Sequence, residues 1–233
     1  MFKYIFVFLV SSGLAAIFLP RHNDGKKDSR QPKAAGVVIA FALIAPLVLS
    51  YALDSSAIDV GLLCAITIGA FLILMVGYVN DLYGLRRWHI VIGQLIAILT
   101  VLPFGLSIKA TSFLPTGSVG STIGSLITIL LFFAVINALS LLSNSPTSVG
   151  VIALIICSFF LALSLIISNF IAAYVSIALM GGIAVFLAYR IFFAVSFASG
   201  RSSSCDLLLG SCGEMFIGFM IAAISIMLSA FLL

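Results

Sequence analysis

The chain has 233 residues, of which 63% are hydrophobic and only 8% are charged. Soluble proteins use charged residues for roughly a quarter of the chain, so this composition excludes a soluble globular protein. The net charge of +4 does not indicate a nucleic-acid partner, because the basic residues lie in short segments beside long apolar runs. We therefore expect an integral membrane protein.

Long apolar runs predict about eight membrane helices within a single transmembrane domain that covers residues 1–233. A membrane helix needs about 20 mostly apolar residues. Pro46 lies inside one run, which is acceptable because neighbouring helices can satisfy the carbonyl that a proline frees. The fold class is therefore an all-α, polytopic membrane helix bundle. The expected spans are 1–19, 35–53, 60–79, 88–104, 121–142, 149–167, 170–189 and 210–233.

The basic residues orient this bundle with its N-terminus outside. Loops on the cytoplasmic side carry an excess of Lys and Arg. The first run resembles a signal peptide, but its cleavage would leave the basic segment after it outside, so we expect it to remain as a helix. Only Lys3 and Lys109 then lie outside. The loops near 20–34, 80–87, 143–148 and 190–208 face the cytoplasm and hold the other nine of the 11 basic residues.

Two features count against a transporter. The chain shows no convincing internal repeat, and no Asp, Glu, Lys or Arg lies near the middle of an expected span. Gly120 and Gly124 have the spacing that lets membrane helices pack closely, which leaves a homodimer or another membrane-protein partner open.

The segment from Val76 to Gln94 combines an acid, two arginines and the ends of two apolar runs. Asp81 follows one span directly, and Arg86 and Arg87 precede the next. A carboxylate with guanidinium groups nearby at the end of a membrane helix suits an anionic or metal-bound substrate. Short loops between membrane helices also carry such residues for topology alone, so both interpretations remain open.

Four polar segments of the chain follow one another in a recognisable order. The first is DSRQPKAAG (28–36), the second GYVNDLYGLRRWHIVIGQ (77–94), the third NALSLLSNSPTSVG (137–150) and the fourth LLGSCGEMFIGF (208–219). In this order they resemble the polyprenyl-phosphate N-acetylhexosamine-1-phosphate transferases, which belong to glycosyltransferase family 4. The matching positions are Arg30, Pro32, Gly36, Gly77, Asp81, Leu85, Gln94, Asn137, Ala138, Gly210, Gly213 and Gly218.

The resemblance implies a reaction and a set of site residues. Members of this family transfer a sugar phosphate from a UDP-sugar to polyprenyl phosphate and release UMP, in the synthesis of cell-envelope polysaccharides at the bacterial inner membrane. Asp81 would be the catalytic residue and, in an active enzyme, would bind Mg²⁺. A histidine-rich loop that the family usually has would come after Leu233. The substrate-binding residues implied are Asn80, Arg86, Arg87, Asn137, Asn144, Gly210 and Gly213.

Three acidic positions of the family pattern are replaced, by Asn80, Ser143 and Ser211. Asn and Ser supply neither a charge for a metal nor a base near pH 7. Asp206 and Glu214 are the only other nearby acids, and we interpret them as a solvated loop residue and a residue stabilised at a helix N-terminus. We therefore expect a pseudoenzyme with weak or no catalysis. The alternatives are an active transferase that uses Asp81, and a non-enzymatic scaffold or small transporter.

Overall fold

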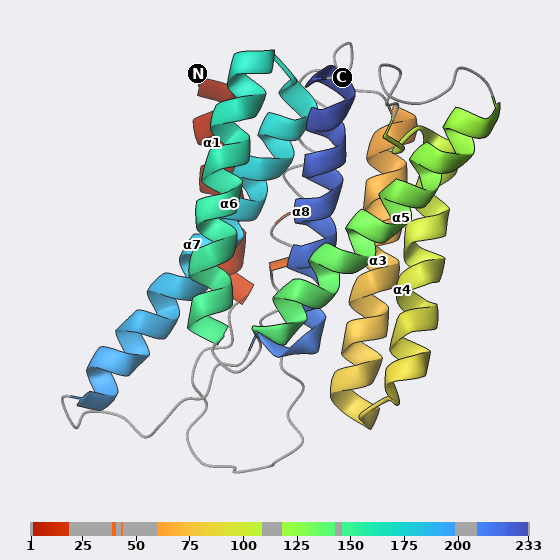
Figure 1. Cartoon of the computed structure of the whole chain (residues 1–233). Coiled ribbons are helices and arrows are strands. Elements are labelled where there is room, and N and C mark those ends of the chain that lie inside the picture. The colour runs from red at the N-terminus through yellow and green to blue at the C-terminus, as the bar shows by residue number, and fades with distance from the viewer. Residues whose placement is uncertain are drawn as a thin grey trace.

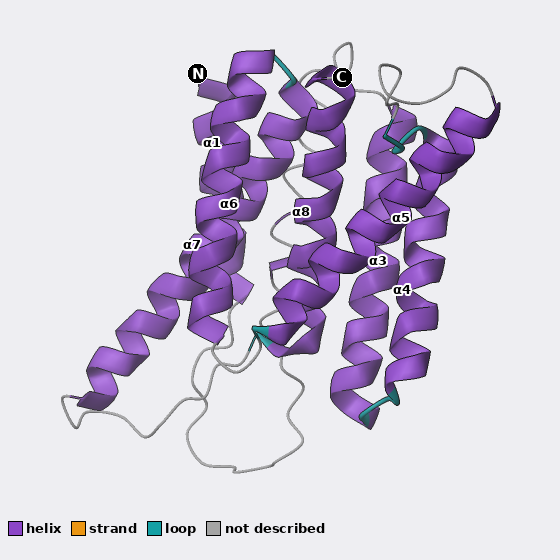
Figure 2. Cartoon of the chain, in the orientation of Figure 1, coloured by secondary structure: helices purple, strands orange, loops and turns teal. Residues whose placement is uncertain are grey.

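The computed structural model describes residues 2–18, 39, 40, 43, 60–108, 118–142, 146–198 and 209–232. All regular structure within these residues is helical, which confirms the all-α prediction (Figures 1 and 2). Most of the second expected span lies outside the described residues. The helices are α1 (Phe2–Phe18), α3 (Val60–Tyr83), α4 (Arg87–Val101), the short 3-10 helix η1 (Leu102–Phe104), α5 (Ser118–Leu141), α6 (Pro146–Ile167), α7 (Phe170–Ala198) and α8 (Gly210–Leu232).

Six of the described helices are long and apolar enough to cross a membrane, namely α3 to α8, with η1 extending α4. Helices are the form expected for such sequences, because every backbone N–H and C=O in lipid must be satisfied within the segment. The apolar stretch of α1, Lys3–Ile17, is shorter. The polytopic membrane bundle is thus confirmed for the described part of the chain.

Helix α8 is the centre of the bundle. It packs against α3, α5, α6 and α7, while α1 packs on α7 and α4 packs on α3. Figure 1 shows α8 between one group formed by α1, α6 and α7 and another formed by α3, α4 and α5. Of its apolar window 89% is buried, against 22% in α4, α5 and α6, so these three helices offer most of their surface to lipid.

Three expected boundaries between helix and loop are wrong. Helix α3 continues to Tyr83, so Asn80 and Asp81 lie in its last turn and not in a loop. The chain leaves the helix at Gly84, which has φ +62° and donates its N–H to the Asn80 carbonyl at 2.9 Å. A glycine in this left-handed conformation is a common helix end, and no earlier residue stops the helix.

The two other differences have similar causes. Helix α7 continues from Phe170 to Ala198, past the start of the inside segment expected at 190, because no Gly or Pro interrupts it there. Helix α6 begins at Pro146, within the turn expected at 143–148. Proline favours the first position of a helix, since its missing N–H has no partner there in any case.

Candidate functional site

The Asp81 carboxylate joins the last turn of α3 to the first turn of α8. Its Oδ1 accepts a hydrogen bond from the Ser211 backbone N–H at 2.9 Å, and its Oδ2 accepts one from the Cys212 N–H at 3.1 Å. The first N–H groups of a helix have no partner within the helix, and the helix dipole favours a negative charge beside them. Asp81 therefore caps α8 from a helix that lies far away in the sequence.

Gly77 allows α8 to come close enough for this contact. A β-carbon at Gly77 would overlap the Cys212 Cα, and would lie 2.9 Å from the Cys212 nitrogen and 3.1 Å from the Ser211 oxygen. One turn before Gly77 in α3, the Leu74 carbonyl oxygen lies 3.5 Å from the Cys212 Sγ. Leu74, Gly77 and Asp81 thus form one strip of α3 against which the start of α8 is seated.

A second polar pair lies between α4 and α5. The Asn137 Nδ2 donates to the Gln94 Oε1 at 3.3 Å and to the Phe133 carbonyl at 2.8 Å. Gln94 is only 1% exposed. Its Nε2 is the one buried side-chain nitrogen or oxygen that has no hydrogen-bond partner, counting only the part of the chain that the structure describes. An unsatisfied buried donor costs about 1–3 kcal/mol, so packing alone does not account for a glutamine here.

The structure brings together only some of the residues predicted from the sequence. Gly210, with φ +73°, and Gly213 lie beside the Asp81 contact in the first turn of α8. Asn80 is half-buried in the last turn of α3, and Arg86 and Arg87 are exposed at the turn between α3 and α4. Asn137 belongs to the pair with Gln94. Asn144 lies outside the described residues.

The described residues do not fit a magnesium site. Mg²⁺ needs several oxygen ligands in octahedral geometry, most often carboxylates and substrate phosphates. Among the residues with described positions there is no group of three or more His, Cys, Asp or Glu close enough to hold a metal ion. Each oxygen of Asp81 already accepts a backbone N–H. Glu214 lies near the start of α8, as expected, and is 2% exposed; Asp206 lies outside the described residues.

Two parts of this site were not predicted. The sequence suggested Ser211 as a replaced acid, whereas its contribution here is a backbone N–H to Asp81. Gln94 was noted as a matching position but not as a site residue, although it is the partner of Asn137. The spacing of Gly77 and Asp81, one helical turn apart, was the available sign that a helix docks on this face of α3.

Comparison with known proteins gives one family. The family model described as glycosyl transferase family 4 matches residues 63–229. The matched range runs from α3 to α8 and so contains the Asp81 contact and the pair of Gln94 and Asn137. The comparison with curated proteins gives no match.

Proposed function

Because the chain belongs to glycosyl transferase family 4, we propose that it is a homologue of the polyprenyl-phosphate sugar-1-phosphate transferases with weak or no catalysis. The parent reaction joins a UDP-N-acetylhexosamine to polyprenyl phosphate and releases UMP. The chain keeps the helical frame of a membrane transferase. Its chemistry is reduced because Asn80, Ser143 and Ser211 replace three acids of the family pattern.

The observation that carries this proposal is the position of Asp81. The parent reaction brings two phosphate groups together, so charge must be neutralised by a cation that carboxylates hold. Asp81 is the acid retained in the motifs, and it is bound to the N-terminus of α8 by both oxygens. The same contact occupies N–H groups of a helix N-terminus, which would otherwise suit a phosphate. One interaction thus reduces the capacity of the site for a metal and for an anion.

The remaining polar groups support a binding role near this end of the bundle. Asn80, Arg86 and Arg87 lie at or just after the end of α3, and the buried Gly210 and Gly213 lie in the facing first turn of α8. We assign to them the contacts with a sugar nucleotide or a lipid phosphate. By analogy with the family, this end of the bundle faces the cytoplasm of a bacterial cell, and Mg²⁺ takes part only if catalysis remains.

Turnover by the purified protein tests the proposal. The protein in detergent is mixed with UDP-N-acetylglucosamine, polyprenyl phosphate and Mg²⁺, and released UMP is measured beside an active transferase of the family as a positive control. We expect UMP release no faster than in the blank without protein. Mg²⁺-dependent release well above that blank would contradict the proposal.

An active transferase that uses Asp81 is the second candidate. A carboxylate has about four lone-pair sites, and the two N–H bonds to α8 leave acceptor capacity for a metal. In that case the Asp81→Asn variant would abolish a measurable UMP release, whereas the exposed Arg87→Ala variant, if folded, would retain part of it. Absence of UMP release from the wild-type protein would remove this candidate.

A further inference from the structure

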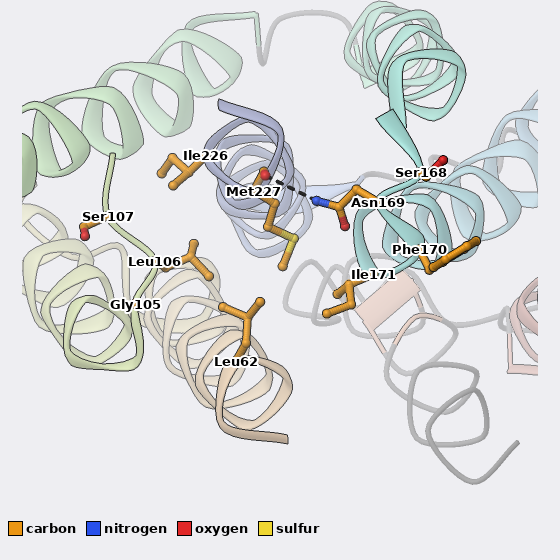
Figure 3. A pocket seen from close by; sticks show the side chains of 10 residues that line it. All are labelled: Leu62, Gly105, Leu106, Ser107, Ser168, Asn169, Phe170, Ile171, Ile226 and Met227. Atoms are coloured by element: carbon orange, nitrogen blue, oxygen red, sulfur yellow. Dashed lines mark hydrogen bonds between the residues drawn. The ribbon is translucent and has the colours of Figure 1, made fainter. Parts of the chain in front are cut away.

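A pocket of about 290 Å³ lies at the end of the bundle opposite to Asp81. Its walls come from the start of α3, the segment after η1, the turn between α6 and α7, and the end of α8. Figure 3 shows side chains from these four segments around the space, among them Leu62, Leu106, Ile171 and Met227. The pocket is thus separate from the site described above.

One wall of the pocket is fixed by Asn169, which is 7% exposed. Its Nδ2 donates to the Met227 carbonyl at 3.3 Å, and its Oδ1 accepts the Ala172 N–H at 3.2 Å (Figure 3 draws the first bond). Its own backbone N–H donates to the Ser164 carbonyl at 2.9 Å. The start of α7 is therefore tied to the end of α8, and both ends of the Asn169 amide group are in use.

The facing wall is fixed in a similar way. The Ile108 N–H, directly after the lining residue Ser107, donates to the Thr128 Oγ1 at 3.0 Å. Thr128 is buried in α5, and its hydroxyl donates to the Gly124 carbonyl at 2.8 Å. Hydrogen bonds thus fix the backbone of the wall on each side of the pocket, which agrees with a pre-formed pocket, as most binding pockets are.

The lining selects an apolar ligand. None of the residues that line the pocket is charged, and most are aliphatic or aromatic. The Asn169 amide is already bonded at both ends, which leaves the Ser107 and Ser168 hydroxyls as the other polar side chains of the lining. Two hydroxyls without a charged group are a poor match for a phosphate or a nucleotide, which needs several paired polar contacts once it leaves water. The pocket residues of α3, α7 and α8 lie at the ends of candidate membrane spans, so the hydrocarbon around these helices begins next to the pocket.

We propose that this pocket binds a hydrocarbon chain of a membrane lipid. Its volume of about 290 Å³ compares with about 150 Å³ for an engineered apolar cavity that stays dry and binds benzene. A segment of a flexible chain therefore fits. The chain comes either from a phospholipid or from a polyprenyl phosphate, and this inference does not depend on whether the opposite end of the bundle catalyses a reaction.

Photolabelling in bilayers tests the proposal. The protein is placed in nanodiscs of phosphatidylethanolamine and phosphatidylglycerol with a trace of a phospholipid that carries a diazirine on its acyl chain. A parallel arm contains polyprenyl phosphate with a diazirine on its chain. We expect more label on Leu106, Ile171 or Met227 than on Ile155, which faces lipid. This excess should occur in at least one of the two arms. The arm in which it occurs identifies the lipid that supplies the chain.

Matched substitutions show whether the labels arise from the pocket. Leu62→Trp fills the space and should abolish labelling of the pocket residues, whereas Leu130→Trp, at a residue 59% exposed on α5, should leave it unchanged. If Leu62→Trp fails to fold, decane replaces it as a competitor and should remove the same labels from the wild-type protein. Labelling no greater than at Ile155, or labelling that survives both Leu62→Trp and decane, would overturn the proposal.

Discussion

Replacing Asp81 by Asn tests whether this carboxylate holds α8 against α3. Asn has one acceptor oxygen, so the Asp81→Asn side chain keeps one of the two bonds to Ser211 and Cys212 and turns an N–H donor toward the other amide. A hydrogen bond to a charged group contributes about 1.5–3 kcal/mol, and a negative charge at a helix N-terminus adds about 0.3–1 kcal/mol. We therefore expect the free energy of unfolding to fall by about 2–4 kcal/mol.

Thermal unfolding in detergent, followed by circular dichroism, measures this loss. For a chain of this size about 2–4 kcal/mol corresponds to a melting temperature lower by about 4–16 °C. Asn80→Ala is the matched control, because Asn80 lies in the same turn of α3 and the structure shows no bond from its side chain to the described residues; it should change stability by less than about 0.5 kcal/mol. If the Asp81→Asn variant has the same melting temperature as the wild-type protein, the capping role is refuted.

Two further substitutions test the packing around the site. Gly77→Ala places a β-carbon against the Cys212 backbone and should lower the free energy of unfolding by about 1–3 kcal/mol. Gly13→Ala is the control and should be neutral or stabilising, because a β-carbon there meets nothing within 4 Å. Equal melting temperatures for the two variants would show that α8 does not pack against Gly77. Gln94→Met removes the unpartnered amide together with its bond from Asn137. The Asn137 Nδ2 keeps its bond to the Phe133 carbonyl, so the variant leaves no new donor without a partner and the melting temperature should be unchanged or higher. A clear drop on the same thermal scan would mean that the Gln94 amide contributes to folding.

The helices of the bundle followed from hydropathy, because a chain in lipid must satisfy its own backbone groups. The ends of the helices were less predictable. Asn80 and Asp81 suggested a loop because they are polar, yet the helix stops only at Gly84, where the backbone turns left-handed. Polarity marks the surface of the membrane, whereas backbone conformation decides where a helix ends.

The sequence context singled out Asp81 as a candidate, but it did not predict the partners of its carboxylate. Ser211 and Cys212 lie about 130 residues further along the chain, and their N–H groups become available only because α8 begins there. Nothing local to Asp81 specifies that contact except the small residue one turn before it, Gly77. Gln94 and Asn137 are likewise recognisable singly, while their pairing depends on how α4 and α5 pack.

Two roles are conceivable for Asp81, a metal ligand and a helix cap, and they favour different arrangements of its carboxylate. A metal ligand in a transferase gains from a free, fully charged carboxylate, whereas a cap gains from a carboxylate that is fixed to a helix N-terminus. Here the two hydrogen bonds favour the second role. A capping role thus accounts for an acid at this position without any catalysis.

Binding of UDP-N-acetylglucosamine to the purified protein, measured by calorimetry with Mg²⁺ and with EDTA, tests this account most directly. We predict that Mg²⁺ does not strengthen binding, because the retained acid is committed to α8. Binding that requires Mg²⁺ in the wild-type protein and is lost in a folded Asp81→Asn variant would contradict the account and restore Asp81 as a metal ligand.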